Sequence, residues 1–254
     1  MSNSESPSHA EIIYLWPERG EQEDMAHHLE PIPEGVKRLT DVNKPALLVF
    51  EPEKSNNKDI GIIVSPGGAY QFLSMDLEGT EIAGWLNSLG ITAFVLQYSV
   101  PENRPAALSD MFEAIKLVRR KYPDLKEVGL LGFSAGAHLS MRAIDNMQLD
   151  GIVDFGMLVY PAYLNEFSER TLTPEISLRD NMPPLFLVGA ANDKDHFPSV
   201  MILADSLSKK KCLFEFHLFN EGGHGFGLRK GNPAAESWPL LAESWLKRNT
   251  SLSN

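Results

Sequence analysis

A serine flanked by glycines is the first feature of this 254-residue sequence that could do chemistry. The stretch Gly132-Phe133-Ser134-Ala135-Gly136 fits the pattern G-x-S-x-G, in which a serine sits on a strained turn between a strand and a helix. The apolar run Val128 to Leu131 leads into this turn, and Ala135 to Ile144 continues with helix-forming residues. Side chains in place of the two glycines would collide with the tightly turned backbone. The pattern therefore predicts that Ser134 is a nucleophile.

A serine hydroxyl becomes an effective nucleophile when a base takes its proton and a carboxylate orients that base. His224 lies among glycines after the apolar run Leu213 to Phe219, and we expect it to be the base. Asp193 and Asp195 both follow the apolar run Leu185 to Val188, so either could orient it. The order Ser, Asp, His along the chain is the one that this strand-turn-helix arrangement requires.

Acyl transfer also needs N–H donors for the negatively charged oxygen of the tetrahedral intermediate. The amide of Ala135, next to Ser134, is expected to supply one of them. The second is expected in the loop that follows the strand Ile60 to Val64, from Gly68 or Ala69.

The remaining histidines and the single cysteine do not indicate a metal or redox site. Four of these histidines are interpreted as structural or solvated residues from their positions: His27 and His28 lie in an acidic leader, His138 on the helix after Ser134, and His217 in the middle of a strand. The pair His27-His28 has no third ligand at a recognisable spacing for a metal. Cys212 cannot form an internal disulfide and lies in an alternating strand pattern, which is typical of a packed thiol. We therefore expect no metal site.

Strand patterns alternate with helical patterns along the chain, which predicts an α/β fold with a mostly parallel sheet covered on both faces. Predicted strands span Ile60 to Val64, Ile91 to Gln97, Val128 to Gly132, Phe155 to Tyr160, Leu185 to Val188 and Leu213 to Phe219. Besides the helix after Ser134, predicted helices span Glu78 to Leu89, Ala107 to Tyr122, Pro198 to Lys209 and Ala234 to Arg248. No repeat or long linker divides the chain, so residues 1–254 are expected to form one domain, with an edge strand and loops over residues 1–35.

Composition narrows the class of partner. The net charge of −11 repels polyanions, and no lysine or arginine block exceeds three residues, so nucleic acid is not an expected partner. No apolar run is long enough to cross a membrane, and the first ten residues are polar without the apolar stretch of a secretory signal. We expect a cytoplasmic protein, or a secreted or periplasmic one if a leader has been removed. The oligomeric state is not predicted.

Taken together, these motifs resemble the α/β-hydrolases related to hormone-sensitive-lipase-type esterases and to carbohydrate acetyl or feruloyl esterases. The resemblance rests on Pro66 to Tyr70, Met75 to Gly79, Ala93 to Tyr98, Gly132 to His138 and Gly222 to Gly227, and it spans roughly residues 12–248. It implies a fold with about eight strands and no large lid. It also implies that Asp193 is the acid, because the family's acid stands four residues past the position of Gly189. Relatives usually have glycine at Ala69 and often histidine at Leu77, which leaves the substrate less defined than the reaction class.

The resemblance further implies a cofactor-free serine esterase that removes acetyl or other short acyl groups from sugars or xylan-type polysaccharides. Although some relatives carry a xylanase label, glycoside cleavage needs two carboxylates facing one bond, and the motifs are those of acyl transfer. The stretch Pro161 to Pro184 has room for a loop and a short helix, not for a bulky apolar lid. Tyr70, Glu78 and Phe226 are expected to border a small-molecule or oligosaccharide ester, as the aromatics Phe72, Tyr160 and Tyr163 could. For each of these aromatics, a role in packing is an equal alternative.

Three alternatives remain open at this point. A serine peptidase could use the same three residues, although common peptidases of this fold carry a large extra domain. A lipase or thioesterase would require an apolar tunnel. A non-catalytic binding module would generally have lost a member of the catalytic set, and here none is missing.

Overall fold

An eight-stranded, mostly parallel sheet forms the centre of the protein. The computed structural model describes residues 11–19, 23–30, 35–146, 151–166 and 171–253. The strands lie in the order β1 (Glu11–Tyr14), β4 (Ala46–Phe50), β7 (Thr92–Gln97), β5 (Ile60–Ser65), β8 (Glu127–Phe133), β9 (Phe155–Val159), β12 (Leu185–Ala190) and β13 (Phe214–Phe219). Neighbours from β7 to β13 pair in parallel, and β4 runs antiparallel to both β1 and β7. This confirms the predicted α/β class.

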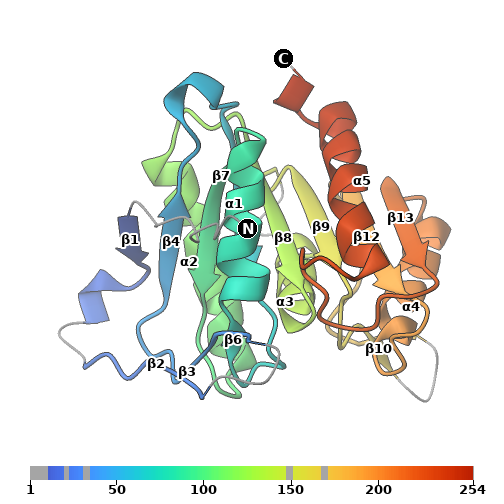
Figure 1. Ribbon diagram of the computed structural model, residues 1–254, viewed down its shortest axis with the longest axis horizontal. Coiled ribbons are helices and arrows are strands. Elements are labelled where there is room, and N and C mark those ends of the chain that lie inside the picture. Colours follow the sequence, from blue (N-terminus) through green and yellow to red (C-terminus); the bar gives the residue numbers. More distant parts are fainter. Residues whose placement is uncertain (1–10, 20–22, 31–34, 147–150, 167–170, 254) are drawn as a thin grey trace.

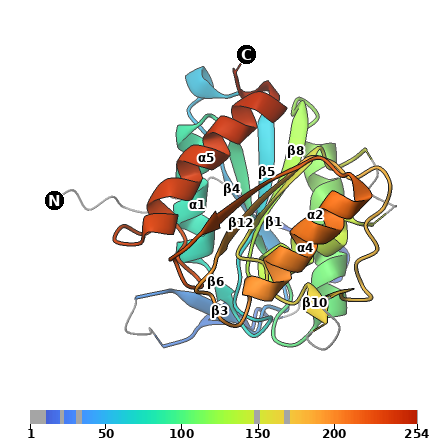
Figure 2. The ribbon, with the colours of Figure 1, turned by 90° about the vertical axis from the view of Figure 1, so that its right-hand side faces the viewer.

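Helices cover both faces of the sheet. They are α1 (Glu81–Ser88), α2 (Arg104–Lys121), α3 (Ala135–Ile144), α4 (Phe197–Lys210) and α5 (Pro233–Asn249). Figure 1 shows α1 and α5 in front of the sheet, and Figure 2 shows α2 and α4 on its other side, where α3 packs beside α2. Parallel strands need such crossover helices, which leave a central strand buried on both faces.

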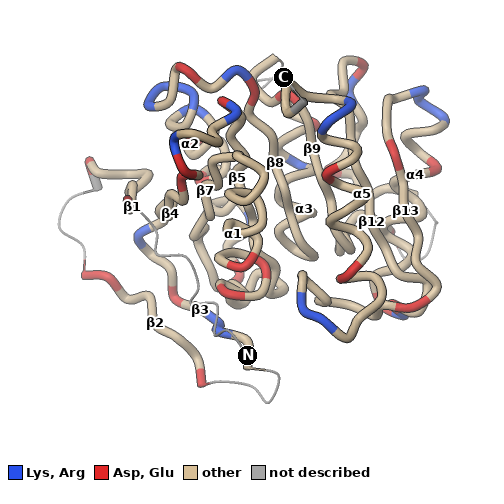
Figure 3. Tube along the Cα trace, turned by 45° about the horizontal axis from the view of Figure 1, so that its top comes forward, with Lys and Arg blue, Asp and Glu red and all other residues tan. Residues whose placement is uncertain are grey.

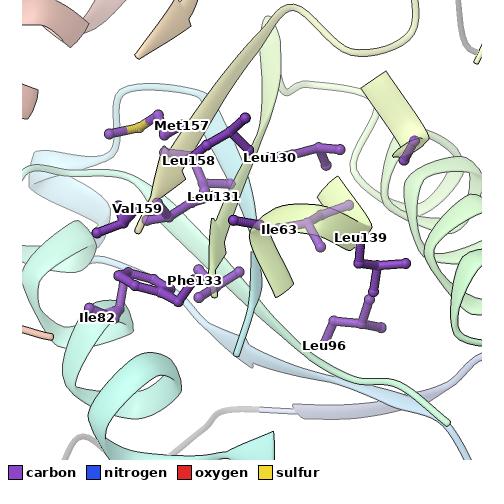
Figure 4. Close-up of a cluster of buried hydrophobic side chains, with 14 of the residues drawn as sticks. Ile63, Ile82, Leu96, Leu130, Leu131, Phe133, Leu139, Met157, Leu158 and Val159 are labelled. Carbon is purple, nitrogen blue, oxygen red and sulfur yellow. The ribbon is translucent and has the colours of Figure 1, made fainter. Parts of the chain in front are cut away.

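The central strand β8 shows why the sheet forms here. Its residues from Val128 to Phe133 are all buried, as a strand covered on both faces requires. In Figure 4, Phe133 lies beside Ile82 of α1, whereas Leu139 of α3 packs with Leu96. Because successive side chains of a strand point to opposite faces, β8 anchors both helical layers and holds the residue that follows it, Ser134, in a rigid frame.

A second, small sheet lies beside the ends of the central strands. It consists of β2 (His27–His28), β3 (Arg38–Thr40) and β6 (Leu73–Ser74), with β3 in the middle. These strands lie together at the lower end of the molecule in Figure 1. They bring part of the N-terminal segment to the same end of the sheet as the loop after β5.

Several predicted boundaries differ from the structure. The strand β4 was absent from the predicted set, because a short apolar run does not distinguish a buried strand from other buried segments. The helix expected from Glu78 begins instead at Glu81, after a π-helical turn over Asp76–Thr80. The helix expected from Ala107 begins earlier, at Arg104, because the Asn103 side chain accepts a hydrogen bond from the Ala106 amide and caps it.

The segment between Tyr160 and Leu185 also differs from expectation. Within its described residues, the strands β10 (Asn165–Glu166) and β11 (Thr171–Leu172) form a hairpin, and there is no helix. The remainder of the described segment consists of turns, a bend and residues without regular secondary structure.

Charged residues of both signs are interspersed along the described chain (Figure 3). In that same part of the chain, no helix combines the length and apolar character needed to cross a bilayer.

Candidate active site

Ser134 stands at the sharp turn between β8 and α3. Its backbone has φ 51° and ψ −118°, a conformation that a non-glycine residue adopts only under strain. The flanking glycines are required by close packing, because a Cβ on Gly132 would overlap the carbonyl oxygen of Gly136, and a Cβ on Gly136 would overlap that of Ser65. The turn therefore holds the Ser134 hydroxyl above the ends of the central strands, as the motif predicts.

His224 reaches Ser134 from the loop that follows β13. Its Nε2 lies 2.7 Å from Oγ of Ser134, across 90 residues of sequence. Gly223 and Gly225, on either side of it, have φ of 66° and 69°, in the left-handed region that favours glycine. The loop can therefore turn back and present the imidazole to the hydroxyl.

Asp193 holds the other side of the imidazole. Its Oδ2 lies 2.6 Å from Nδ1 of His224, and its side chain is buried. Asp195, the alternative acid, is exposed. When the imidazole is neutral, a proton on Nδ1 is donated to Asp193, and Nε2 is left to accept the Ser134 proton. The structure thus brings Ser134, His224 and Asp193 into one hydrogen-bonded chain.

The expected oxyanion donors lie around the same hydroxyl. Gly68 and Ala69 line the pocket that contains Ser134, and Ala135 follows Ser134 at the first position of α3. Within the described residues, the amides of Gly68, Ala69 and Ala135 donate to no other protein group. These donors are available to an incoming oxygen. Ala69 has φ 56°, a conformation that costs an L-residue about 1–2 kcal/mol.

Glu78 lines the pocket and also holds the loop after β5. One carboxylate oxygen accepts a hydrogen bond from the Gly67 amide at 2.7 Å, and the other accepts one from the Tyr160 hydroxyl at 2.8 Å. Burial raises the pKa of Glu78, while these two hydrogen bonds act in the opposite direction. Although Glu78 reaches the pocket wall, both of its oxygens are already engaged.

The structure places Tyr70 and Phe226, the two aromatics expected to border the substrate, on different sides of the pocket wall. The Tyr70 side chain is 1% exposed and turns away from the pocket, with its hydroxyl oxygen 2.8 Å from Nδ1 of His138. Phe226 lines the pocket and packs edge-on against Tyr160, with ring centroids 4.5 Å apart. A sequence pattern does not show to which side of a loop a side chain turns, and that side separates these two aromatics.

The pocket has a volume of about 590 Å³. Its wall combines apolar side chains, polar groups and three cations. Besides the residues already named, the pocket is lined by Val36, Arg38, Phe72, Ser74, Leu77, Tyr163, His196, Arg229, Lys230 and Asn232. No three His, Cys, Asp or Glu side chains come together as a metal site in the part of the chain that the structure describes.

His196 is a pocket residue that sequence reasoning missed. Its ring packs on that of His224, with centroids 4.2 Å apart and an interplanar angle of 46°. Burial and the neighbouring His224 both lower the pKa of His196. Its place three residues after Asp193, on the same loop, was the signal that could have identified it.

The chain is similar to known proteins in sequence and in structure. The sequence model of the dienelactone hydrolase family matches residues 92–248. An acetylxylan esterase of Xylanibacter ruminicola is 33% identical over 128 residues, which are 48% of this chain and 26% of that protein. The chain therefore aligns with about a quarter of that longer relative.

Two solved structures are similar over nearly the whole chain. The acetyl ester-xyloside bifunctional hydrolase of Caldicellulosiruptor lactoaceticus is 27% identical, with 97% of this chain and 98% of that chain covered and a TM-score of 0.73. An α/β-hydrolase from a Medee basin deep-sea metagenome library is 24% identical, with 91% and 100% covered and a TM-score of 0.70, a likeness that shows the fold alone.

Proposed function

Because the chain belongs to the dienelactone hydrolase family, we propose that it is a serine carboxylic-ester hydrolase that works through an acyl-enzyme on Ser134. The observation that carries this proposal is the hydrogen-bonded chain from Ser134 Oγ to His224 Nε2, at 2.7 Å, and from His224 Nδ1 to Asp193, at 2.6 Å. A base and its orienting carboxylate at these distances are what a serine nucleophile requires.

The chemistry follows from these positions. His224 takes the Ser134 proton as Oγ attacks the ester carbonyl, and Asp193 stabilises the imidazolium that forms. Amides of Ala135 and of Gly68 or Ala69 receive the oxyanion. When the C–O bond breaks, His224 gives its proton to the leaving alcohol and an ester of Ser134 remains. Water, activated by the same imidazole, then releases the acid and restores the hydroxyl.

We propose acetyl or other short acyl esters of carbohydrates as the substrate. The named activities of the Xylanibacter and Caldicellulosiruptor relatives support this class. The pocket argues for ester cleavage over glycoside cleavage, because Glu78 is the single carboxylate among its described lining residues and both its oxygens are bonded. A glycosidase needs two carboxylates facing the bond that breaks.

Covalent labelling combined with one variant tests the proposal. A fluorophosphonate should modify Ser134, located by peptide mapping, and Ser134→Ala should fold normally and lose hydrolysis of 4-nitrophenyl acetate by several orders of magnitude. Labelling of another serine, or a variant with near wild-type activity, would contradict the mechanism. Acetyl esters should have a higher kcat/KM than octanoyl esters, and the reverse order would contradict the short acyl group.

A further inference from the structure

We propose that Arg229, held by Asp76 and Glu81, is a positioning residue that fixes the loop of His224. This inference rests on the proposed esterase function and identifies the contacts on which the placement of its base depends. Arg229 stands five residues after His224. The two carboxylates lie 153 and 148 residues away in sequence, on the π-helical turn over Asp76–Thr80 and at the first position of α1.

The loop that carries His224 has little structure of its own. Residues 220–232 connect β13 to α5 without a helix or a strand, and five of these thirteen residues are glycine. Glycine loses more conformational freedom than any other residue when a chain becomes ordered. Contacts with neighbouring elements must therefore fix this loop, because local backbone preference does not.

Arg229 ties the loop to the segment in which α1 begins. Its Nη2 lies 3.0 Å from Oδ2 of Asp76 and 2.8 Å from Oε1 of Glu81, and its Nε donates to the Glu81 carboxylate at 3.2 Å. All three side chains are buried or partly buried, so solvent screens these ion pairs less than it would on an open surface. A planar guanidinium holds two carboxylates in fixed directions, which a lysine ammonium does not reproduce.

Asp76 joins Arg229 to two further segments. Its Oδ1 accepts hydrogen bonds from the amides of Lys37 and Leu77, each at 2.8 Å, while its Oδ2 faces Arg229. Leu77 in turn packs against Gly227, where an added Cβ would overlap the Leu77 side chain. One buried carboxylate therefore connects the residue before β3, the π-helical turn and the loop of the base.

The two carboxylates act on position and not on the reacting groups. Among the described residues, neither Asp76 nor Glu81 lines the pocket, and neither forms a hydrogen bond or ion pair with His224. A displacement of about 1 Å at a reacting group can cost about 10²-fold in rate. Because His224 serves both the formation and the hydrolysis of the acyl-enzyme, its misplacement should lower kcat with little effect on substrate binding.

Asp76→Asn tests the network without altering the pocket wall. Asparagine can keep one oxygen for the two backbone amides, but it presents an NH₂ group in place of the carboxylate oxygen that faces Arg229. With 4-nitrophenyl acetate, kcat should fall roughly tenfold and KM should stay within about twofold of wild type. The low-field proton resonance of the hydrogen bond between His224 Nδ1 and Asp193 should broaden, because a mobile imidazole exchanges this proton faster with solvent.

Variants of Arg229 show whether the two residues act as one unit. The double variant Asp76→Asn with Arg229→Gln should be about as slow as the slower single variant, because the shared contact is lost only once. Arg229→Lys keeps the charge and loses the fork, so it should lower kcat to a similar degree. Glu81→Gln should lower kcat about threefold, and its partly exposed side chain makes it the second test if Asp76→Asn fails to fold.

Asp154→Asn is the matched control. Asp154 pairs with Arg119 and accepts a hydrogen bond from the Val128 amide at 2.7 Å, so the substitution breaks contacts of the same kind. Val128 lies near the start of β8, whereas Ser134 follows the end of that strand. The control should lower the free energy of unfolding about as much as Asp76→Asn does and should leave kcat near wild type.

These measurements separate positioning from stability. A kcat near wild type in Asp76→Asn, a rise in KM alone, an equal fall of kcat in Asp154→Asn, or losses that multiply in the double variant would each overturn the role of Arg229. Fluorophosphonate labelling of Ser134 in wild type would leave the esterase function standing in all of those cases. A wild-type protein that neither takes this label nor hydrolyses 4-nitrophenyl acetate would overturn the proposed function itself.

Discussion

The hydroxyl oxygen of Tyr70 lies 2.8 Å from Nδ1 of His138, and this contact joins the loop after β5 to the helix that begins next to Ser134. The loop carries Gly68 and Ala69, whose amides we expect to bind the oxyanion, and Ala69 and Tyr70 both have left-handed backbone. Strained conformations of this kind persist when surrounding contacts hold them. We infer that the contact between Tyr70 and His138 fixes the position of the loop amides of Gly68 and Ala69 relative to the Ala135 amide.

Removing the Tyr70 hydroxyl should therefore loosen the oxyanion site. We expect Tyr70→Phe to lower kcat about tenfold with KM nearly unchanged, and to lower the free energy of unfolding by about 1–2 kcal/mol, because a buried ring nitrogen of His138 loses its partner. Affinity for a trifluoromethyl ketone, which mimics the tetrahedral intermediate, should fall by a factor similar to kcat. Tyr122→Phe, which removes a phenol bonded to Glu11 at 3.3 Å, is the control and should leave both measurements near wild type.

The burial of His138 predicts how stability depends on pH. Burial is the main cause that lowers the pKa of His138 from its usual 6.5, and the cations Arg104 and Arg142 lower it further. Glu175, whose carboxylate lies 3.5 Å from Nε2 of His138, acts in the opposite direction and raises this pKa. The other ring nitrogen, Nδ1, is bonded to the hydroxyl of Tyr70. Below pH 6.5 the unfolded chain binds a proton at this histidine more readily than the folded chain does. The free energy of unfolding should therefore fall as pH drops from 6.5 towards the lower, folded pKa.

Urea unfolding between pH 7.5 and 5 measures this effect. The free energy of unfolding of His138→Gln should change less with pH in this window than that of wild type. Both proteins keep His196, so any contribution from that histidine is common to the two curves. Parallel curves would show that His138 takes up its proton equally in the folded and unfolded states.

Two neighbouring aspartates provide a matched test of the acid. Asp193→Asn should lower kcat by roughly 10⁴, because the imidazole loses the group that fixes its tautomer and stabilises its charge. Asp195→Asn removes the same charge two residues away from an exposed side chain and should stay within about tenfold of wild type. Steady-state hydrolysis of 4-nitrophenyl acetate measures both, and the reverse ranking would move the role to Asp195.

The ring of His196 should position His224 by packing. We expect His196→Ala to lower kcat about tenfold, because a ring at 4.2 Å restricts how the catalytic imidazole turns. His196→Phe keeps an aromatic ring there and should restore most of kcat. Equal losses in the two variants would show that the imidazole of His196 acts through its nitrogens.

Local pattern was enough to predict the frame of the protein. Six strands of the central sheet and the helices between them follow from runs of apolar residues and from helix periodicity, because burial on both faces demands such runs. Local pattern could not define β4, or the π-helical turn before α1, because short segments of this kind depend on their neighbours in space.

For the site, the sequence by itself determined the Ser134 turn and the glycine-rich loop of His224, since both depend on backbone conformations that adjacent glycines permit. Between Asp193 and Asp195 the residues alone did not choose, and family position pointed to the one that the structure places on His224. Tertiary structure decided the rest: that Tyr70 turns to His138, that Glu78 is occupied by Gly67 and Tyr160, and that His196 and Arg38 face the pocket. The physical reason is that these relationships join segments far apart in the chain, and the direction in which each side chain points is settled by packing and hydrogen bonding between elements that no local pattern records.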